Sequence, residues 1–290
     1  MIKLNEVKKQ IDKNIQIGPL TFTINPGTVT ALIGNNGAGK STLIRMITGM
    51  VYTDSGNISR FNNSYDGETW KEFIGYVPQT IIGYERFSLK QVSELHAISF
   101  KSWDKNTFSR LVEKFDIPIT KRFDALSVGM QKKALFILAL SHHSKLLIMD
   151  EPLSGVDIEG QEQMRQEWIT YLEEDPNRSI LFATHVPDEV KEFADYIVCM
   201  KDGTISNSYE KDDLLQKFRK YWVNTKNDKI RNFPGVIHVV CNGTNYEVFS
   251  DNIEKTEESF KNENIEVISE QNVHFSDTLR LLLKMKGEFK

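Results

Sequence analysis

A glycine-rich stretch at positions 34–41, GNNGAGKS, has the residue types and spacing needed to bind a phosphate group. It matches G-x-x-x-x-G-K-[ST] and lies between an apolar, β-branched run over 28–33 and an apolar, helix-like run over 42–48. Glycines let consecutive backbone N–H groups turn towards an anion, and the dipole of the following helix favours negative charge there. Lys40 would then reach the β- and γ-phosphates of a nucleotide, and the Ser41 hydroxyl would bind Mg²⁺.

A phosphate loop needs an acidic partner for the metal ion, and the stretch SKLLIMDEP at 144–152 supplies one. Its apolar run ends in Asp150, which would orient Mg²⁺ or its water, and in Glu151, which would polarise an attacking water. A strand that ends in Asp-Glu is common by itself, so the pair indicates a catalytic site only because a phosphate loop precedes it. The residues predicted to contact the nucleotide are Gly34, Asn35, Asn36, Gly37, Ala38, Gly39, Lys40, Ser41 and Thr42.

Two short matches favour a different class of protein, the GTPases. DIEG at Asp157 fits D-x-x-G, and TKND at Thr225 fits the guanine-reading pattern [NT]-K-x-D. However, Asp157 follows a loop rather than the end of an apolar strand, and we expect no buried strand before Thr225. Patterns with two or three fixed positions arise often by chance in 290 residues, so we disfavour this alternative.

The composition is that of an ordinary globular chain and argues against several classes of function. Hydrophobic residues make up 40%, and 36 Lys and Arg against 40 Asp and Glu give a net charge of −4. That balance does not favour nucleic-acid binding, which usually leaves a basic footprint. Two cysteines indicate no disulfide framework, which fits the cytosol. The first residues lack the apolar stretch of a signal peptide, and no apolar run approaches the ~20 residues that span a bilayer, so we expect no membrane crossing.

Further motifs extend the pattern over roughly residues 1–210. They are YVPQT with Gln79, LSVGMQ at 126–131, LLIMDEPLSGVD at 146–157 and LFATHVPDEV with His185. In this order and spacing, the chain resembles the nucleotide-binding subunit of ATP-binding cassette (ABC) transporters. The resemblance implies an α/β fold of the P-loop NTPase type with a helical subdomain. It also implies hydrolysis of ATP with Mg²⁺, and a dimer in which ATP is held between two chains.

The resemblance implies roles for individual residues as well. Gln79 would contact Mg²⁺ and the attacking water, His185 would contact the γ-phosphate, and Asp157 would be the aspartate of the D-loop. The oxygen ligands of Mg²⁺ would be Ser41, Gln79 and Asp150. The signature residues, which would contact the ATP of the opposite copy, are Ser127, Val128, Gly129 and Gln131. From the residues alone, Gln79 could equally be an ordinary loop residue and His185 a helix cap.

Gly129 stands in the first turn of an apolar helix, where Ala would be more stable. Ser127 is a good N-cap, and a Ser N-cap followed by Gly leaves the N–H groups of the helix end bare. We interpret this end as a second anion site, which in the family closes on the γ-phosphate held by the other copy. Gly129 would permit the close approach. A helix cap without a ligand is the simpler alternative.

Two departures from the family pattern bear on function. The signature reads LSVGM rather than LSGGQ, a variation that many exporter ATPases share, so we infer no loss of activity from it. The family usually stacks adenine on an aromatic residue near the start of the chain, but here VKKQIDK places Gln10 or Ile11 there. Ile11 offers only apolar contact, so we predict comparable use of ATP and GTP.

The remaining sequence must hold these motifs in place. Helix-like spacing over 88–100 and 105–117 predicts a helical subdomain over about 80–143. Its aromatic residues would belong to the core or line a groove for a membrane partner. The pair of histidines at 142–143 is predicted to be a solvated helix cap. The complete ATPase domain is predicted over 1–212.

A small α+β accessory domain, for dimer contact or regulation, is predicted over 213–290. A connecting helix over 210–222 would lead into it. The stretches predicted as strands are 235–240, 245–250 and 265–270. Helices are predicted near 256–261 and over 276–286, the second with Ser276 as N-cap.

These features predict a transporter motor: a homodimer that hydrolyses Mg·ATP and drives a separate integral membrane subunit from the cytoplasmic face of the membrane. The layout resembles exporter ATPases of bacitracin-resistance and phenol-soluble-modulin type, which predicts export of peptides or drugs and phenol-soluble modulins as one specific cargo. The alternative is a soluble ABC ATPase that acts on nucleic acid or ribosomes. It is disfavoured because there is one phosphate loop and no heptad run between Lys40 and Ser127. A non-catalytic scaffold is disfavoured by the presence of Glu151 and His185.

Overall fold

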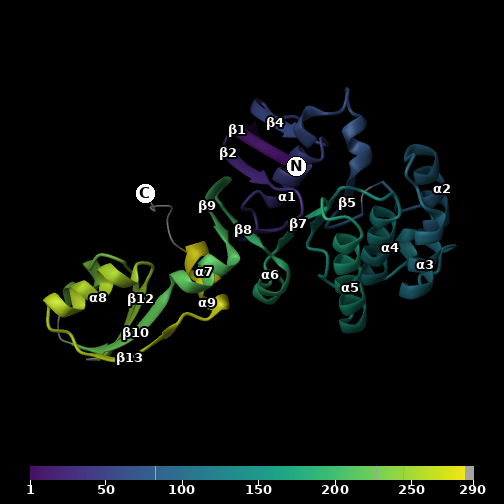
Figure 1. Ribbon diagram of the computed structural model, residues 1–290. Helices are drawn as coiled ribbons and strands as arrows, with labels where there is room; N and C mark the ends of the chain where they lie inside the picture. Colours follow the sequence, from purple (N-terminus) through teal and green to yellow (C-terminus); the bar gives the residue numbers. More distant parts are fainter. Residues whose placement is uncertain (82, 226–227, 244, 285–290) are drawn as a thin grey trace. The chain divides into compact units, whose positions relative to one another are not determined.

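The computed structural model describes residues 1–81, 83–225, 228–243 and 245–284. They form two compact units (Figure 1). The first comprises Met1–Val186 and Tyr196–Ser208, and the second comprises Pro187–Asp195 and the chain from Tyr209 onward. Positions 226–227 of the TKND stretch and the last two residues of the predicted helix over 276–286 lie outside the described residues. No described helix combines the length and the apolar character required to cross a membrane.

The first unit is built on a six-stranded sheet with the order β5-β6-β7-β3-β8-β9. The pairs from β5 to β8 are parallel, and β3, β6 and β7 are buried along their whole length, as strands covered on both faces must be. The strands predicted before the phosphate loop and before the Asp-Glu pair are β3 and β6. The bounds are β3 Val29–Ile33, β5 Ile74–Val77, β6 Leu146–Asp150, β7 Ser179–Thr184, β8 Tyr196–Lys201 and β9 Thr204–Glu210.

A second, antiparallel sheet with the order β2-β1-β4 belongs to the same unit and was not predicted from the sequence. Its strands are β1 Ile2–Gln10, β2 Gln16–Ile24 and β4 Ser55–Arg60. From Gly18 onward, buried and exposed residues alternate along β2, so one face of this sheet joins the core that also buries α1 (Lys40–Ile47). This hairpin brings residues 11 to 17 next to the phosphate loop.

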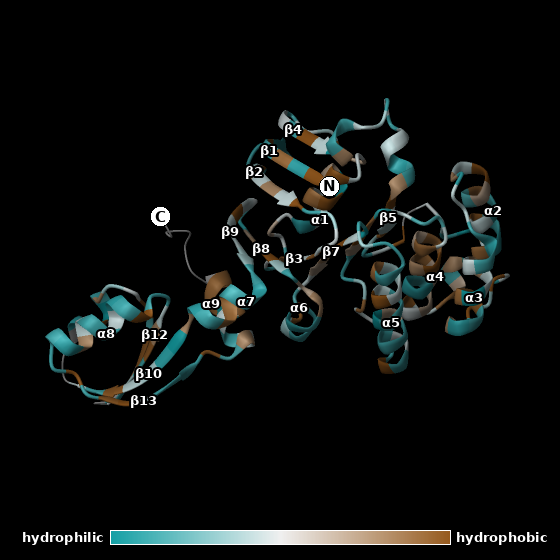
Figure 2. Ribbon diagram, viewed as in Figure 1, coloured by the Kyte–Doolittle hydropathy of each residue, from teal (hydrophilic) through white to brown (hydrophobic). Residues whose placement is uncertain are grey.

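The helical subdomain contains α2, α3 and α4, and α5 follows β6. Each of these helices begins with a side chain that caps its N-terminus. The starts of α2, α3 and α4 were predicted from the sequence, whereas that of α5 was not. α4 is buried nearly all round, and Figure 2 shows its predominantly hydrophobic colouring. Glu167 connects α5 to α3 of the helical subdomain, because Arg110 and Lys114 of α3 both pair with it at 2.8 Å. The bounds are α2 Leu89–Ser99, α3 Lys105–Phe115, α4 Val128–Leu140 and α5 Ile158–Glu174.

The histidine pair after α4 differs from its prediction. His142 is 2% exposed, its ring nitrogens lie 3.3 Å from the carbonyl oxygen of Leu138 and 3.1 Å from that of Ile74, and its ring stacks on Phe100. It is therefore a core residue rather than a solvated cap, since its polar atoms find backbone partners. His143 is exposed and lies 3.2 Å from Asp104, as a surface cap would.

The second unit contains an antiparallel sheet with the order β11-β12-β10-β13. α8 covers one face, where Phe260 packs against Tyr221 with 5.3 Å between the ring centres. α6 belongs to this unit and packs against α9. The bounds are α6 Pro187–Phe193, α7 Lys211–Lys217, β10 Arg219–Asn224, β11 Val236–Asn242, β12 Asn245–Ser250, α8 Ile253–Asn262, β13 Val267–Asn272 and α9 Phe275–Lys284. Short 3₁₀ turns occur at Phe61–Asn63, Thr69–Phe73, Phe123–Ala125 and Asp228–Asn232.

The prediction of one connecting helix over 210–222 was wrong in its second half. α7 ends at Lys217, and the following residues form β10, in the middle of the sheet. Tyr221 and Val223 are buried while Trp222 between them is on the other face, which is the two-residue period of a strand. β10 also stands directly before Thr225, contrary to the expectation that no buried strand precedes the TKND stretch.

Candidate active site

The phosphate loop joins the end of β3 to the start of α1. Gly37 and Gly39 have φ values of +81° and +101°, a left-handed conformation that glycine adopts without strain. Gly39 is the N-cap of α1 and supplies no side chain to cap it, so the first N–H groups of the helix stay open to a ligand. None of the described atoms would lie within 4 Å of a Cβ added at Gly37. The loop therefore offers an open backbone cradle for an anion.

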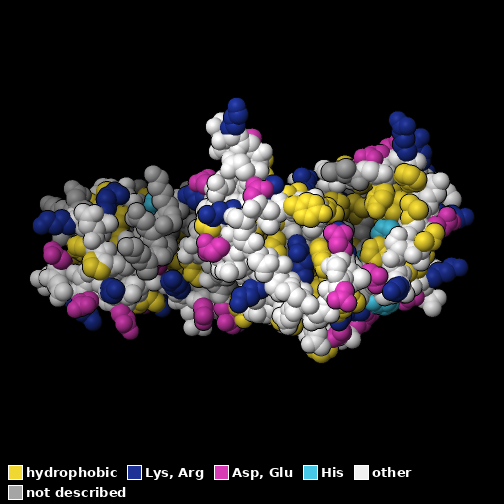
Figure 3. Space-filling model, turned by 90° about the horizontal axis from the view of Figure 1, so that it is seen from above, with side chains coloured by type: hydrophobic (Ala, Val, Ile, Leu, Met, Phe, Trp, Pro, Cys, Tyr) yellow, Lys and Arg dark blue, Asp and Glu magenta, His cyan; other side chains and the backbone are white. Residues whose placement is uncertain are grey.

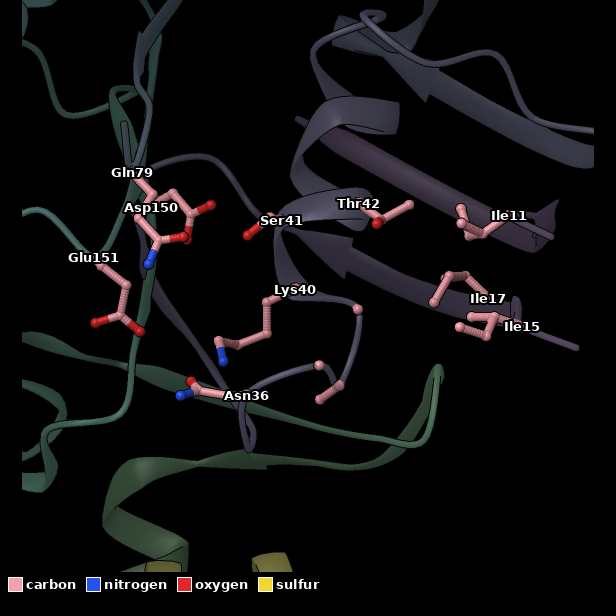
Figure 4. Close-up of a pocket in the computed structure, with 13 residues that line it drawn as sticks. Ile11, Ile15, Ile17, Asn36, Lys40, Ser41, Thr42, Gln79, Asp150 and Glu151 are labelled. Carbon is pink, nitrogen blue, oxygen red and sulfur yellow. The ribbon is translucent and has the colours of Figure 1, made fainter. Parts of the chain in front are cut away.

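A cavity of about 330 Å³ opens beside this loop (Figure 4). Lys40 and Ser41 lie on one side of it, and Asp150 and Glu151 lie on the other. Three isoleucines form the end of the cavity that is farthest from the carboxylates. The lining residues are Ile11, Ile15, Ile17, Asn36, Gly37, Ala38, Gly39, Lys40, Ser41, Thr42, Gln79, Asp150 and Glu151.

Lys40 supplies the positive charge of the cavity. Its side chain is 7% exposed, and its Nζ donates to the carbonyl oxygens of Gly34 at 2.7 Å and Asn35 at 3.3 Å. Burial lowers the pKa of the Lys40 ammonium below its ordinary value, and the carboxylates of Glu151 and then Asp150 oppose that shift. The ammonium group is thus held within the loop by carbonyl oxygens, close to where an anion would bind.

Ser41, Gln79 and Asp150 bring three kinds of oxygen to one cavity. Asp150 is 2% exposed, and burial raises its pKa, whereas the hydrogen bond from the Ser41 hydroxyl is the largest influence that lowers it. The described residues contain no group of three or more His, Cys, Asp or Glu able to hold a metal alone. Hydroxyl, amide and carboxylate oxygens fit Mg²⁺, a hard cation that prefers oxygen ligands and is usually bound through one or two carboxylates, waters and substrate phosphates.

Glu151 is held in an unusual conformation next to the phosphate loop. Its φ is +51°, which is rare for a residue other than glycine, and its side chain is 8% exposed. Its backbone N–H donates to the carbonyl oxygen of Ala183 at 2.9 Å, and its Oε2 lies 2.8 Å from Nδ1 of His185. The His185 side chain is 61% exposed, so one face of the pair stays open to a ligand. Neither the left-handed backbone nor the Glu–His pair could be read from the sequence.

All these groups follow the carboxyl ends of parallel strands. The phosphate loop follows β3, Gln79 follows β5, Asp150 ends β6 and His185 follows β7. In a parallel α/β sheet these ends meet at one edge, where such folds bind their ligands. The sheet order thus places the residues predicted from four separate motifs around one site.

The signature residues lie outside this cavity. Ser127 accepts a hydrogen bond from the Met130 N–H at 3.2 Å, which leaves other N–H groups of the first turn of α4 without a side-chain cap. Val128 is 61% exposed. The amide of Gln131 turns back to donate to the carbonyl oxygens of Phe123 and Leu126. No signature residue lines the cavity described above, so one chain does not bring them to its own phosphate loop.

Gly129 has a structural reason within the chain. A Cβ added there would lie 2.7 Å from the carbonyl oxygen of Gly155 and 3.3 Å from Cα of Val156. The start of α4 therefore packs on the loop that leads to Asp157, and only glycine allows that approach. That Gly129 also permits the close approach of the γ-phosphate held by the other copy stays a prediction.

Asp157 is the N-cap of α5, and its carboxylate pairs with Nζ of Lys133 at 2.7 Å. It neither ends a strand nor lines the cavity, unlike the metal-binding aspartate of a GTPase. The described part of the TKND stretch belongs to the second unit and contributes nothing to the cavity. Both short matches are therefore explained without guanine recognition.

Comparison with known proteins agrees with this geometry. Residues 17–154 match the ABC transporter family. The chain carries an ABC transporter ATPase domain. The P-loop α/β fold with a helical subdomain, predicted from the motifs, is confirmed. ATP binding and hydrolysis are the activities of this ABC ATPase domain.

Relatives of this ABC ATPase come from several branches of the family. The ABC transporter ATP-binding protein YtrB of Bacillus subtilis (strain 168) is 27% identical over 226 residues, which cover 76% of this chain and 75% of YtrB. The bacitracin transport ATP-binding protein BcrA of Bacillus licheniformis is 26% identical over 226 residues, covering 76% of this chain and 73% of BcrA. Human ATP-binding cassette sub-family A member 10 is 31% identical over 223 residues, 70% of this chain, but these span only 14% of that longer protein.

Among solved structures, the ATP-binding subunit of an ABC transporter superposes with a TM-score of 0.66 at 26% identity. The match covers 74% of this chain and 92% of that one.

Two groups in this ABC ATPase domain escaped the sequence analysis. Ile15 and Ile17 line the cavity beside Ile11, because the turn between β1 and β2, which pair Gln10 with Gln16, folds over it. The alternation of buried and exposed residues along β2 is the signal that could have revealed this hairpin. The other group is Lys132, which is 4% exposed. The signal that could have revealed it is its position one helical turn before the buried Leu135 and Phe136, which is on the inner face of α4.

Proposed function

We propose that the chain is the ATP-hydrolysing motor subunit of an ABC transporter, acting as a nucleotide-sandwich dimer coupled to a separate membrane subunit. The observation that carries the proposal is the division of the site. One chain gathers Lys40, Asp150 and Glu151 around a cavity, with His185 paired to Glu151, while the end of α4 at Ser127 does not line that cavity. The terminal phosphate of a bound nucleotide then stays uncovered until a second copy supplies that helix end.

In this proposal, residues of both copies act on one ATP. Lys40 and the loop N–H groups bind the β- and γ-phosphates. Ser41, Gln79 and Asp150 would hold Mg²⁺, which would supply positive charge next to the phosphates. Glu151 polarises the attacking water, and His185 orients the Glu151 carboxylate and contacts the γ-phosphate. The signature residues Ser127, Val128, Gly129 and Gln131 of the second copy close the site, with Asp157 in the loop beside them.

A second cavity supports a membrane partner. It measures about 750 Å³ and shares Ser41, Gln79 and Asp150 with the nucleotide site. Its walls include Tyr84 and Phe100, two of the subdomain aromatics, whereas Phe87 is 41% exposed at the surface. We propose that a segment of the membrane subunit enters here, so that the chain lies on the cytoplasmic face of the membrane. Gln79 then lies between that segment and the site of hydrolysis.

The proposed cargo is a peptide or drug moved outward, with phenol-soluble modulins as the specific hypothesis. The similarity to BcrA, whose name states bacitracin transport, supports an exporter of this kind. The membrane subunit selects the cargo, so the support is indirect. On the face seen in Figure 3, acidic and basic side chains are interspersed rather than gathered into a basic stripe. That pattern, together with the net charge of −4, supports the absence of a nucleic-acid partner.

Affinity capture of the tagged chain from detergent-solubilised cells distinguishes the two candidate functions. We expect an integral membrane protein to co-purify in stoichiometric amount, and addition of Mg·ATP to stimulate phosphate release by the captured complex. The matched sample is a lysate of the same cells from which membranes are sedimented before detergent is added, and no such partner should be recovered from it. Recovery of the chain with ribosomes instead would support the soluble ABC ATPase and contradict the motor.

We predict that GTP is hydrolysed nearly as well as ATP. The base would meet Ile11, Ile15 and Ile17, which offer apolar contact and no hydrogen-bond partner to read its edge. Apolar pockets discriminate weakly, so kcat/KM for the two nucleotides should agree within about tenfold. Steady-state phosphate release with each nucleotide measures the ratio. Ile11→Tyr, which adds a ring for stacking, is expected to lower KM for both purines alike. A preference for ATP beyond about tenfold would show that other groups read the base.

A further inference from the structure

Lys132 is a buried lysine whose ammonium group lies at the end of the catalytic strand. The residue is 4% exposed and stands in the second turn of α4. Its Nζ donates to the carbonyl oxygen of Asp150 at 3.2 Å and also to that of Glu151. A buried charge destabilises a fold unless polar partners surround it, so these contacts account for its position. The ammonium group therefore binds the main chain at the point where the acidic pair leaves β6.

The backbone of Glu151 requires such support. A residue other than glycine keeps a φ of +51° only when its surroundings define that conformation. The Glu151 N–H is bound to Ala183, and the Glu151 carboxylate is paired with His185. The Glu151 carbonyl receives Lys132 and, at 3.3 Å, the N–H of Ser154. Lys132 is thus the charged donor among the contacts that orient this peptide group, and the direction of the carboxylate follows from that orientation.

α4 contacts both ends of residues 150–157, which we call the catalytic segment. Lys132 binds the start of that segment at Asp150 and Glu151. Gly129 packs on Gly155 near its end, and Lys133 pairs with Asp157. The same helix begins at Ser127. The start of α4 is therefore in contact with both ends of the segment 150–157 within the chain.

We propose that Lys132 is a positioning residue for ATP hydrolysis, which fixes the main chain of Glu151 and so ties the direction of its carboxylate to the helix that begins at Ser127. The inference rests on the proposed function, in which Glu151 polarises water and the start of α4 contacts the ATP of the other copy. When the start of α4 closes on the ATP of the other copy, the movement of α4 then also adjusts Glu151 of its own chain.

Lys132→Met removes the ammonium group and keeps the length of the side chain. We expect kcat for ATP to fall about tenfold or more, while KM changes less than about threefold, because the phosphate contacts remain. The matched control is Lys114→Met, which removes another ammonium group that pairs with a buried carboxylate, at 2.8 Å from Glu167 and away from the site. It should lower Tm without lowering kcat. Should Lys132→Met fail to fold, Lys132→Gln replaces it under the same criteria.

A second measurement separates positioning from a general structural role. We expect Lys132→Met, added to Glu151→Gln, to change the ATP concentration needed for dimer formation less than about threefold relative to Glu151→Gln alone. The Glu151 carboxylate is already absent in that variant, so its direction has no further effect. An unchanged kcat in Lys132→Met would overturn the inference. So would loss of ATP-induced dimers in the double variant, since Lys132 would then support the fold or the interface instead. If Glu151→Gln alone forms no ATP dimer, the proposed function has failed, whatever Lys132 does.

Discussion

Replacing Glu151 with Gln is expected to abolish ATP turnover and to trap the chain as an ATP-bound dimer. Glutamine keeps the size of the side chain and a hydrogen bond to His185, but it cannot polarise water as a carboxylate does. The loss of a general base corresponds to a fall in kcat of about 10²–10⁴-fold. Phosphate release measures the loss, and light scattering with Mg·ATP measures the dimer.

Glu173→Gln makes the same chemical change at an exposed position near the C-terminal end of α5 and should leave phosphate release and dimer formation unchanged. Normal hydrolysis by Glu151→Gln would remove this residue from the mechanism. A variant that neither hydrolyses ATP nor dimerises would contradict the sandwich, because binding without hydrolysis is the state that holds the two copies together.

His185→Ala is expected to lower kcat by about 10²-fold, an effect typical of removing one preorganised polar contact in a transition state. The His185 ring lies 2.8 Å from the Glu151 carboxylate, and the side chain is 61% exposed. Its removal therefore creates no cavity in the core, and Tm should hardly change. Single-turnover hydrolysis and thermal unfolding provide the two measurements.

The control is His274→Ala, an exposed histidine of the second unit. Because His185 and Glu151 act as a pair, the double variant should be little worse than Glu151→Gln alone. Additive losses would show that the two side chains work independently, in disagreement with the hydrogen bond between them.

The parts of the fold that the sequence predicted are those with strong local signals. GNNGAGKS needs a strand before it and a helix after it, and β3 and α1 are both there. Ser88, Asp104 and Ser127 mark helix starts because a cap bonds its own helix within three residues. The strand β12 coincides with its predicted range, 245–250, because its apolar residues stand between clear turns.

The failures share a physical cause, since they depend on contacts distant in sequence. β1 also pairs with β4, Ile2 with Arg60, and this pairing does not show in a local window. Lys220 and Trp222 look like part of a helix until β12 and β13 are placed on either side of β10. In the same way, the pairing of Glu151 with His185 and the burial of Lys132 depend on how β6, β7 and α4 pack. Residue types were thus predictable at the site, but the partners that orient them were not.

The boundary between the two units carries a consequence for chimeric proteins. α6 begins two residues after His185 in the chain, yet it belongs to the second unit, where it packs against α9. Lys211 also donates from its backbone to Asp195 and from its side chain to Lys191. Grafting the C-terminal region of a relative onto this ATPase at position 212 would therefore set a native α6 against a foreign helix. An exchange that preserves these contacts must carry residues 187–195 along with it.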